Sequence, residues 1–376
     1  MRKAPLLSTI ELRKQNRNRV YRQLVTSGPT TKQELAQTLN MSLPTLTQNL
    51  KELSAMGLVD DSETTDSTGG RRPRLITVVP DAKFALGAEL SRGHIRLVAL
   101  DLQQNQLAFQ IINKPFQNTE IYGQELAAVL ETFLDENALD RTRLLGVGLT
   151  LPGIFSADQR TIECAPTMGM RDKMPCRILG SIPYPTHLDN DATCGGFAEW
   201  WSRTDNASTA YLSISRGIGG AILIDGNIYA GTHHRSAEFG HMCIHPEGRE
   251  CSCGHKGCLE AYCSAARISD DLDISLEDFF TSLEEGNSSY QAIWKEYLDD
   301  LAIALNNIHI MLDCDVIVGG SVTQFLPVYQ EELQDRLRQM NPFVKEGNYV
   351  HFCRYHGRSI CIGAAMRFTT KYILEI

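Results

Sequence analysis

Three cysteines lie close together in one short segment of this chain. Cys251, Cys253 and Cys258 fall within eight positions, and Gly254 and Gly257 separate them. Glycines allow tight turns, which can bring three sulfur atoms to about 2.3 Å from one zinc ion. The spacing favours zinc over free thiols in a cysteine-rich loop, but it leaves both open. If the loop binds zinc, the fold has to bring a fourth ligand to it.

The cysteine count and the lack of long apolar runs narrow the class of protein. Eleven cysteines are an odd number, which excludes a fully paired disulfide framework. The first residues, MRKAPLLSTIELRKQN, contain no apolar run of the length that a secretory signal needs. No stretch approaches the ~18 consecutive apolar residues of a membrane helix. We therefore expect a cytoplasmic protein with reduced thiols and no membrane partner.

The charge is distributed unevenly along the 376 residues, a length that suits two or three domains. Residues 1–74 contain 12 Lys or Arg and 7 Asp or Glu. The remainder contains 24 Lys or Arg and 38 Asp or Glu. A small basic head on a large acidic body favours a separate partner for the head, with nucleic acid and a merely solvated basic surface as the two interpretations.

The basic head has the pattern of short helices. Residues 12–27 suit a helix that ends at Gly28-Pro29. Thr31 and Glu34 have the spacing of a capping box at the start of a second helix. A third helix is expected after Ser42, a good N-cap, with Pro44 in its first turn and a buried face of Leu43, Leu46, Leu50 and Leu53.

Two short helices joined by a tight turn predict a helix-turn-helix, and the next segment predicts a wing. Residues 57–80 read as a strand, a glycine-tipped turn and a strand, with Arg71 and Arg72 at the tip, where they can contact phosphates or a minor groove. The alternative is a helical pair that packs on a partner protein. The pattern favours double-stranded DNA, and the candidate contacts are Ser42, Thr45, Thr47, Gln48, Asn49, Lys51, Arg71 and Arg72.

From about residue 83 the pattern changes to strands that alternate with helices. FALGAEL, HIRLVALDL and QLAFQIINKP read as consecutive strands, and a helix follows in YGQELAAVLETFLDE. LLGVGLTLPGIF, THLDN and DCDVIVGG read as further strands, and TAYLSISRGIGGAILIDG as a hairpin. This alternation predicts α/β lobes, with polar residues at strand ends placed to meet a ligand in the cleft between them.

Four motifs of the body are distinctive, namely SAEFGHM (236–242), CSCGHKGCLE (251–260), LDNDA (188–192) and RGIGGAILIDGNIYAG (216–231). With these motifs the whole chain shows a resemblance to transcriptional regulators of the ROK family, which also contains sugar kinases. The resemblance implies a two-lobed, actin-like fold of the hexokinase type behind the N-terminal winged helix-turn-helix. We expect a DNA-binding domain at 1–75 and a ROK domain at 76–376, with lobe one at about 76–187 plus the C-terminal helix and lobe two at about 188–360.

The resemblance also implies two sites. The fourth zinc ligand would be His241, ten residues before Cys251, which makes a closed structural site with Cys251, Cys253 and Cys258. Sugar hydroxyls would be contacted by Asn190, Asp191, Glu238, His241 and Glu260, and Gly153 would approach the sugar through its backbone. The alternative for the polar set is a buried network that only caps helices.

The nucleotide half of the family pattern is altered. Where the kinases carry a glycine-rich phosphate turn, this chain has Glu89, Ser91 and Arg92, and Ser215-Arg216 replaces a second glycine-threonine pair. We therefore expect a sugar-responsive repressor of carbohydrate-utilisation genes, a homodimer or homotetramer on palindromic operator DNA, and no enzyme activity. A sugar kinase, and a DNA-bound regulator that answers to a partner protein, are the alternatives.

Overall fold

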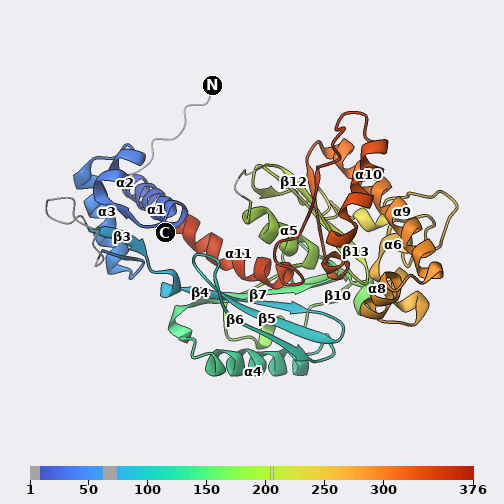
Figure 1. Ribbon diagram of the computed structural model, residues 1–376. Helices are drawn as coiled ribbons and strands as arrows, with labels where there is room; N and C mark the ends of the chain where they lie inside the picture. The colour runs from blue at the N-terminus through green and yellow to red at the C-terminus, as the bar shows by residue number, and fades with distance from the viewer. Residues whose placement is uncertain (1–8, 62–73, 204, 206) are drawn as a thin grey trace.

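The protein consists of a small helical head and a two-lobed α/β body, joined through one long C-terminal helix (Figure 1). The computed structural model describes residues 9–61, 74–203, 205 and 207–376. The expected three-helix head with a small wing sheet and the expected α/β body of two lobes are both present.

The head contains the three expected helices, α1 (Thr9–Ser27), α2 (Lys32–Thr38) and α3 (Leu43–Ala55). The capping box at α2 is present in both directions between Thr31 and Glu34. Ser42 caps α3, because its hydroxyl accepts a hydrogen bond from the Thr45 amide at 3.3 Å. These local hydrogen bonds satisfy amides that a helix start leaves without intrahelical partners.

The wing is a small sheet in the order β1-β3-β2, formed by β1 (Thr30–Thr31), β2 (Val59–Asp60) and β3 (Leu75–Val78). The two expected strands are confirmed, and β2 pairs with β3 in antiparallel orientation. Arg71 and Arg72 lie outside the described residues.

The core of the head includes side chains from the other end of the chain. Leu46, Leu50 and Leu53 are buried as predicted, whereas Leu43, which was also expected in that face, is 48% exposed. The C-terminal helix is α11 (Ser359–Glu375). Its Ile373, and Ile376 directly after its end, pack into the same cluster. The exposure of Leu43 follows from its place at the first position of α3, where the chain has not yet turned towards this core.

The first lobe is built on a five-stranded sheet in the order β11-β7-β4-β5-β6. Strands β4, β5 and β6 form an antiparallel meander, and β4, β7 and β11 run parallel. Helix α4 (Glu120–Glu136) covers one face and α11 covers the other (Figure 1). The strands are β4 (Phe84–Leu90), β5 (His94–Asp101), β6 (Gln106–Asn113), β7 (Leu144–Leu151) and β11 (Thr186–Asn190).

The second lobe is built on a five-stranded sheet in the order β14-β13-β12-β15-β16. Helix α5 (Asp191–Trp201) packs on β12 and β13, and a layer that includes α8, α9 and part of α10 shares a core with this sheet. The strands are β12 (Thr209–Ile214), β13 (Ile218–Ile224), β14 (Asn227–Ile228), β15 (Asp315–Gly319) and β16 (Val350–Phe352). The helices are α6 (Glu260–Cys263), α7 (Ala265–Ile268), α8 (Leu276–Glu284), α9 (Ser288–Leu312) and α10 (Gln330–Met340).

Strand β11 belongs to the first sheet, where it pairs with β7. The expected start of lobe two at about residue 188 therefore falls inside a strand of lobe one. A short strand has no local feature that selects its sheet, since the choice depends on which edge is free to pair. The change of lobe coincides with the start of α5 at Asp191.

The remaining elements are short. A three-stranded hairpin sheet follows β7 and consists of β8 (Ile154–Phe155), β9 (Thr161–Cys164) and β10 (Met174–Pro175). The 3-10 turns are η1 (Pro80–Ala82), η2 (Arg141–Arg143), η3 (Pro166–Met168), η4 (Leu179–Ser181), η5 (Phe239–His241), η6 (Asp270–Leu272), η7 (Ser321–Gln324) and η8 (Leu326–Tyr329).

Glycines allow the close packing of α5 and α11 between the two sheets. A Cβ atom at Gly363 of α11 would lie 1.9 Å from the Cys194 carbonyl oxygen of α5. On the opposite side of α11, a Cβ at Gly87 or Gly148 would lie 1.9 or 2.0 Å from a carbonyl oxygen of the helix. The order across the body is therefore first sheet, α11, α5 and second sheet, and the helices touch backbone to backbone.

We expect Gly363→Ala to destabilise the protein. Alanine in place of glycine inside a helix gains about 0.5–1 kcal/mol, but overpacking costs about 1–3 kcal/mol, and here the obstacle is a backbone oxygen that cannot move alone. The melting temperature of the body should fall by several degrees. Gly180→Ala is the control, since nothing lies within 4 Å of a Cβ there. Equal melting temperatures for the two variants would contradict this account of the helix contact.

Candidate functional site

The four expected metal ligands lie together at one end of the second lobe. The ligand atoms of His241, Cys251, Cys253 and Cys258 are all within 4.8 Å of one another. The Cys253 and Cys258 sulfurs are 3.7 Å apart, and the Cys251 sulfur is 3.9 Å from His241 Nδ1. Ligands arranged tetrahedrally at about 2.3 Å from one ion lie about 3.8 Å from each other. The cluster therefore has the ligand types and the spacing that could hold one metal ion.

The loop between the cysteines depends on its glycines. Gly254 and Gly257 both have positive φ, +88° and +80°, and a Cβ at Gly257 would lie 2.0 Å from the His245 carbonyl oxygen. The Cys251 amide donates to the His255 carbonyl at 2.8 Å, and the Gly254 amide donates to the Cys251 carbonyl at 2.9 Å. These turns fold the sulfurs inward, as the sequence spacing predicted.

Glu260 connects the cysteine loop to the glycine segment that precedes β13. One carboxylate oxygen accepts a hydrogen bond from the Ile218 amide at 2.9 Å, and the other accepts from the Ser252 hydroxyl at 3.0 Å. A Cβ at Gly217 would lie 2.9 Å from the first of these oxygens. Glu260 is therefore already engaged at both oxygens, although each retains capacity to accept a further hydrogen bond.

Asn190 and Asp191 stand where β11 ends and α5 begins. The Asn190 side chain accepts from the Thr193 amide at 2.9 Å, which caps α5, and donates to the Gly153 carbonyl at 3.0 Å. Asp191 accepts from the Ala192 amide at 2.8 Å. Burial raises the pKa of Asp191 to about 6, because water is excluded from its carboxylate.

The other carboxylates of the cleft lie near Asp191. Burial raises the pKa of Glu238, His241 opposes this rise, and the charges of Asp191 and Glu260 add to it. Asp191 and Glu260 thus both lie within electrostatic range of Glu238. Neighbouring carboxylates with raised pKa values, as Asp191 and Glu238 have, are typical of a functional site.

Glu89 adds a buried carboxylate to this group. Burial raises its pKa to about 7, an ion pair with Arg96 on the neighbouring strand opposes this, and the charge of Asp191 adds to it. Its Oε2 atom and the Thr150 hydroxyl, opposite it on β7, have no hydrogen-bond partner among the described residues. Glu89 was singled out from the sequence, but its neighbours Arg96 and Thr150 were not. The signal for Arg96 was a single arginine within the apolar strand HIRLVALDL.

Residues 215–216 and the Gly319-Gly320 turn, which belong to the nucleotide half of the family pattern, make structural contacts in this chain. Arg216 forms an exposed ion pair with Asp270 at 2.7 Å, and the Ser215 hydroxyl accepts from the Ser321 amide at 3.2 Å. Gly320 has a positive φ of +92°, and a Cβ there would lie 2.2 Å from the Ile214 carbonyl oxygen. The Gly319-Gly320 turn is thus explained by packing.

On helix α3, five of the six candidate DNA contacts are accessible. Ser42, Thr45, Gln48 and Lys51 are exposed and Thr47 is half-buried. Asn49, which was expected on the outer face, is only 3% exposed and donates to the Thr45 carbonyl at 2.8 Å. The expectation for Asn49 was wrong, because it lies three residues after Leu46 and therefore on the buried side of the helix.

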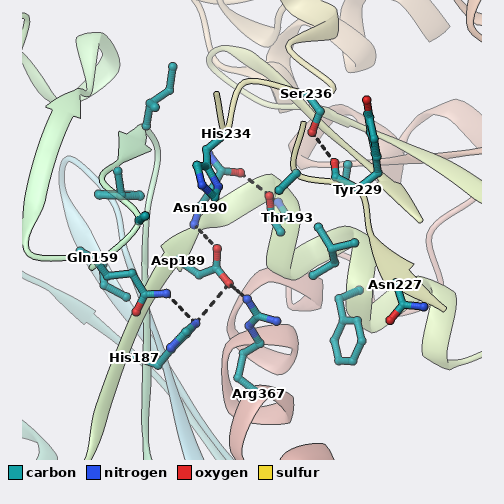
Figure 2. A pocket seen from close by; sticks show the side chains of 18 of the residues that line it. Gln159, His187, Asp189, Asn190, Thr193, Asn227, Tyr229, His234, Ser236 and Arg367 are labelled. Atoms are coloured by element: carbon teal, nitrogen blue, oxygen red, sulfur yellow. Dashed lines mark hydrogen bonds and ion pairs between the residues drawn. The ribbon is translucent and has the colours of Figure 1, made fainter. Parts of the chain in front are cut away.

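A large cavity lies beside the start of α5, between the two lobes and α11 (Figure 2). Its volume is about 920 Å³, and Gly153, Asn190 and Glu238 are among its lining residues. Asp189 forms an ion pair with Arg367 of α11 in its wall, and His187 and Gln159 continue this polar row (Figure 2). A ligand cleft between the lobes was expected from the sequence, but its wall of α11 residues was not, because α11 is remote in the chain.

Among the described residues, no helix is both long and apolar enough to cross a membrane.

The fold is a winged helix-turn-helix joined to a hexokinase-type body, in which buried and half-buried carboxylates gather around the start of α5. The chain belongs to the ROK family, whose sequence profile matches residues 85–366, and a profile described as winged helix-turn-helix DNA-binding matches residues 13–60. The recognition made from the sequence motifs is therefore confirmed.

Individual relatives include repressors and kinases. The chain is 25% identical to the xylose repressor of Bacillus subtilis over 342 residues, 89% of this chain and 85% of the relative. It is 29% identical to the N-acetyl-D-glucosamine kinase of Yersinia enterocolitica over 60% of this chain and 80% of the relative. A crystal structure of a ROK family transcriptional regulator, described as a homologue of the Escherichia coli Mlc protein, shares the fold over 97% of both chains with a TM-score of 0.79 at 20% identity.

We expect Glu89→Gln to reduce the loss of stability on going from pH 5 to pH 8. The pKa of Glu89 is about 7 when folded and about 4.5 when unfolded. Between these values the folded protein holds a proton that the unfolded chain releases, so stability falls as the pH rises through this window. Glutamine does not titrate, so the melting temperature of this variant should fall less over that range.

The control for this measurement is Glu163→Gln, which removes a carboxylate from a surface pair with Lys173. Melting temperatures are compared at pH 5, 6, 7 and 8 in the same buffers. If the curves of Glu89→Gln and wild type run parallel, the burial of an ionisable Glu89 is refuted.

Proposed function

We propose that the protein is a sugar-responsive, DNA-binding transcriptional repressor. The observation that carries this proposal is the course of α11, which passes the carboxylate cleft and ends in the core of the DNA-binding head. The similarity to the relative named xylose repressor covers most of both chains and thus supports this proposal. A ligand that changes the cleft can therefore change the head through one continuous helix.

In this proposal the sugar lies against Asn190, Asp191, Glu238, His241 and Glu260, with the Gly153 backbone beside it. Asp191 and Glu238 have the largest free capacity, because Glu260 and Asn190 already make structural hydrogen bonds. A carboxylate accepts hydrogen bonds from two adjacent hydroxyls, and such bonds favour its charged form. Sugar hydroxyls thereby offset the burial of these acids.

The head would contact double-stranded operator DNA through α3. The exposed hydroxyl and amide groups of Ser42, Thr45, Thr47 and Gln48 can bond base edges, and Lys51 can bond phosphate. Arg71 and Arg72 are proposed to contact phosphates from the wing. Two heads are needed for a palindromic operator, so the proposal includes a homodimer or homotetramer.

The metal in this proposal is Zn²⁺ in a structural role. Three thiolates and one imidazole occupy all four tetrahedral positions, so no position is left for a substrate. The ion would hold the loop that carries Glu260 and would fix the orientation of the His241 ring through its Nδ1 atom. The site would therefore stabilise the sugar contacts without taking part in a reaction.

We expect about one zinc per chain in freshly purified, reduced protein. Cys251→Ser and Cys258→Ser should each lose the metal and lower the melting temperature, because binding contributes to folding. Cys243→Ser is the matched control, since Cys243 lies in the same region but outside the cluster. Elemental analysis that finds no zinc in wild type, or equal zinc in Cys251→Ser, would exclude this assignment.

We also propose that the body does not phosphorylate its sugar. Glu89 is paired with Arg96, and Arg216 projects from the segment where the family kinases carry a glycine-threonine pair. Arg216, and Arg92 in the first of these turns, add bulk where a backbone amide would have to reach a phosphate. ATP turnover in the presence of the sugars that bind, measured at high enzyme concentration, would overturn this part of the proposal.

We expect the best sugar of a panel to weaken binding to operator DNA by about 10²-fold, which requires about 2.7 kcal/mol of coupling. The panel contains D-xylose, D-glucose and N-acetyl-D-glucosamine, and the DNA is a duplex selected by the protein from a random library. Fluorescence anisotropy gives the affinity with and without sugar. Equal affinities in wild type would refute sugar control and would favour a partner protein as the signal.

Asp191→Ala tests the location of the sugar in the same experiment. This variant should bind the duplex as wild type does but should not respond to sugar, because the carboxylate that accepts the hydroxyls is gone. Asp191→Asn keeps the side-chain shape in case the alanine variant folds poorly. Asp135→Ala on the surface of α4 is the control and should respond as wild type does.

A further inference from the structure

The cavity between the lobes continues from one side of the proposed sugar contacts towards α11. Gly153, Asn190 and Glu238 line it, whereas Asp191, His241 and Glu260 do not. The cavity therefore begins at one side of the proposed sugar ring and extends away from the cysteine loop. Its far wall includes Arg367 and Lys371, one turn apart on α11.

The size of the cavity exceeds what one sugar ring needs. Its volume is about 920 Å³. Cavities of about 300–1,000 Å³ enclose most of a drug-sized ligand, and a single pyranose has far fewer atoms than such a ligand. A ring held by the proposed contacts would leave most of this space to water.

The lining suits a neutral, hydroxyl-rich ligand. Gln159, Thr193, Asn227 and Ser236 contribute amides and hydroxyls (Figure 2). Phe155 and Tyr229 contribute aromatic surface. Such a mixture can bond hydroxyls and cover the apolar face of a sugar ring.

The charges in the wall favour a neutral ligand over a phosphorylated one. Arg367 is held by Asp189 at 2.5 Å, so its charge is compensated within the protein. Glu238 and Glu375 also line the cavity and would repel a phosphate. Lys371 is exposed on α11. A phosphate would therefore meet more carboxylates than Arg or Lys side chains.

We propose that the effector is a neutral glycoside longer than one ring, a disaccharide or short oligosaccharide. One ring occupies the sugar contacts of the proposed function, on which this inference rests. The next ring occupies the cavity, between Tyr229 and Asn227 of the β14 segment and the Arg367 face of α11.

The second ring gives the effector direct access to the helix that reaches the head. The ion pair of Arg367 with Asp189 joins α11 to β11, and six residues beyond Arg367 the side chain of Ile373 enters the head core. The Asn18 side chain of α1 donates to the Ile373 carbonyl. A ligand that fits the cavity in only one position of α11 shifts the head by its differential affinity for the two positions.

Matched sugar pairs test this inference by calorimetry on the full chain. The pairs are D-xylose with xylobiose, D-glucose with cellobiose, and N-acetyl-D-glucosamine with N,N′-diacetylchitobiose. For at least one pair, the disaccharide should bind about tenfold more tightly than its monosaccharide, about 1.4 kcal/mol. Equal or weaker binding of the disaccharide in every pair would overturn the inference.

Two variants of the same hairpin locate the second ring. Tyr229→Ala removes a half-exposed ring from the cavity, and Ile224→Ala removes a similarly exposed side chain that does not line it. Tyr229→Ala should reduce disaccharide affinity about tenfold and monosaccharide affinity less than about twofold, and Ile224→Ala should change neither. An equal loss for both sugars in Tyr229→Ala would place the monosaccharide itself at Tyr229 and refute the two-ring arrangement.

The outcomes separate this inference from the proposed function. If monosaccharides bind and Asp191→Ala abolishes their binding, but disaccharides gain nothing, the sugar-responsive function stands and the extended effector is wrong. If no sugar of any pair binds, the proposed function fails and this inference fails with it.

Gln159→Ala, on the opposite wall, provides a second variant in case Tyr229→Ala folds poorly.

Discussion

The backbone contact between α5 and α11 determines how the parts of this protein are arranged. Gly363 of α11 lies against the Cys194 carbonyl of α5, and no side chain larger than hydrogen fits between them. Since α11 also lies on the first sheet and α5 on the second, this contact sets the spacing of the lobes. The same α11 ends in the core of the head through Ile373 and Ile376. A movement at the helix contact therefore cannot leave the head unaffected.

The acidic cleft follows from the same geometry. Helix α5 begins at Asp191, so the contact that positions α5 also positions this carboxylate close to Glu89 and Glu238. The burial of several carboxylates near each other lowers the stability of the folded protein, and Arg96 compensates only one of them. Hydroxyl groups from a sugar can offset part of this cost without adding charge. The electrostatics thus favour a neutral, hydroxyl-bearing ligand in both the cleft and the adjoining cavity.

The cysteine loop lies beside the cleft and is connected to it through Glu260. Its cluster of His241, Cys251, Cys253 and Cys258 lies beside Glu260, whose carboxylate bonds the Ile218 amide at the start of β13. A metal in this cluster would hold the loop, Glu260 and the glycine segment in one arrangement. The proposed sugar contacts on this side would then be rigid, while the proposed contacts on the side of α11 could move with the helix.

The sequence by itself determined the features that depend on neighbouring residues. The capping box of Thr31 and Glu34, the cap of Ser42 and the glycine turns between the cysteines need only local spacing, and the motif around Glu238 and His241 indicated the family. Only the tertiary structure decided that Asn49 is buried, that Leu43 is exposed, that β11 joins the first sheet and that α11 completes the head. These depend on which surfaces, distant in the chain, are free to pack or pair. A periodic pattern shows that a face is apolar, but its partner is selected by the fold.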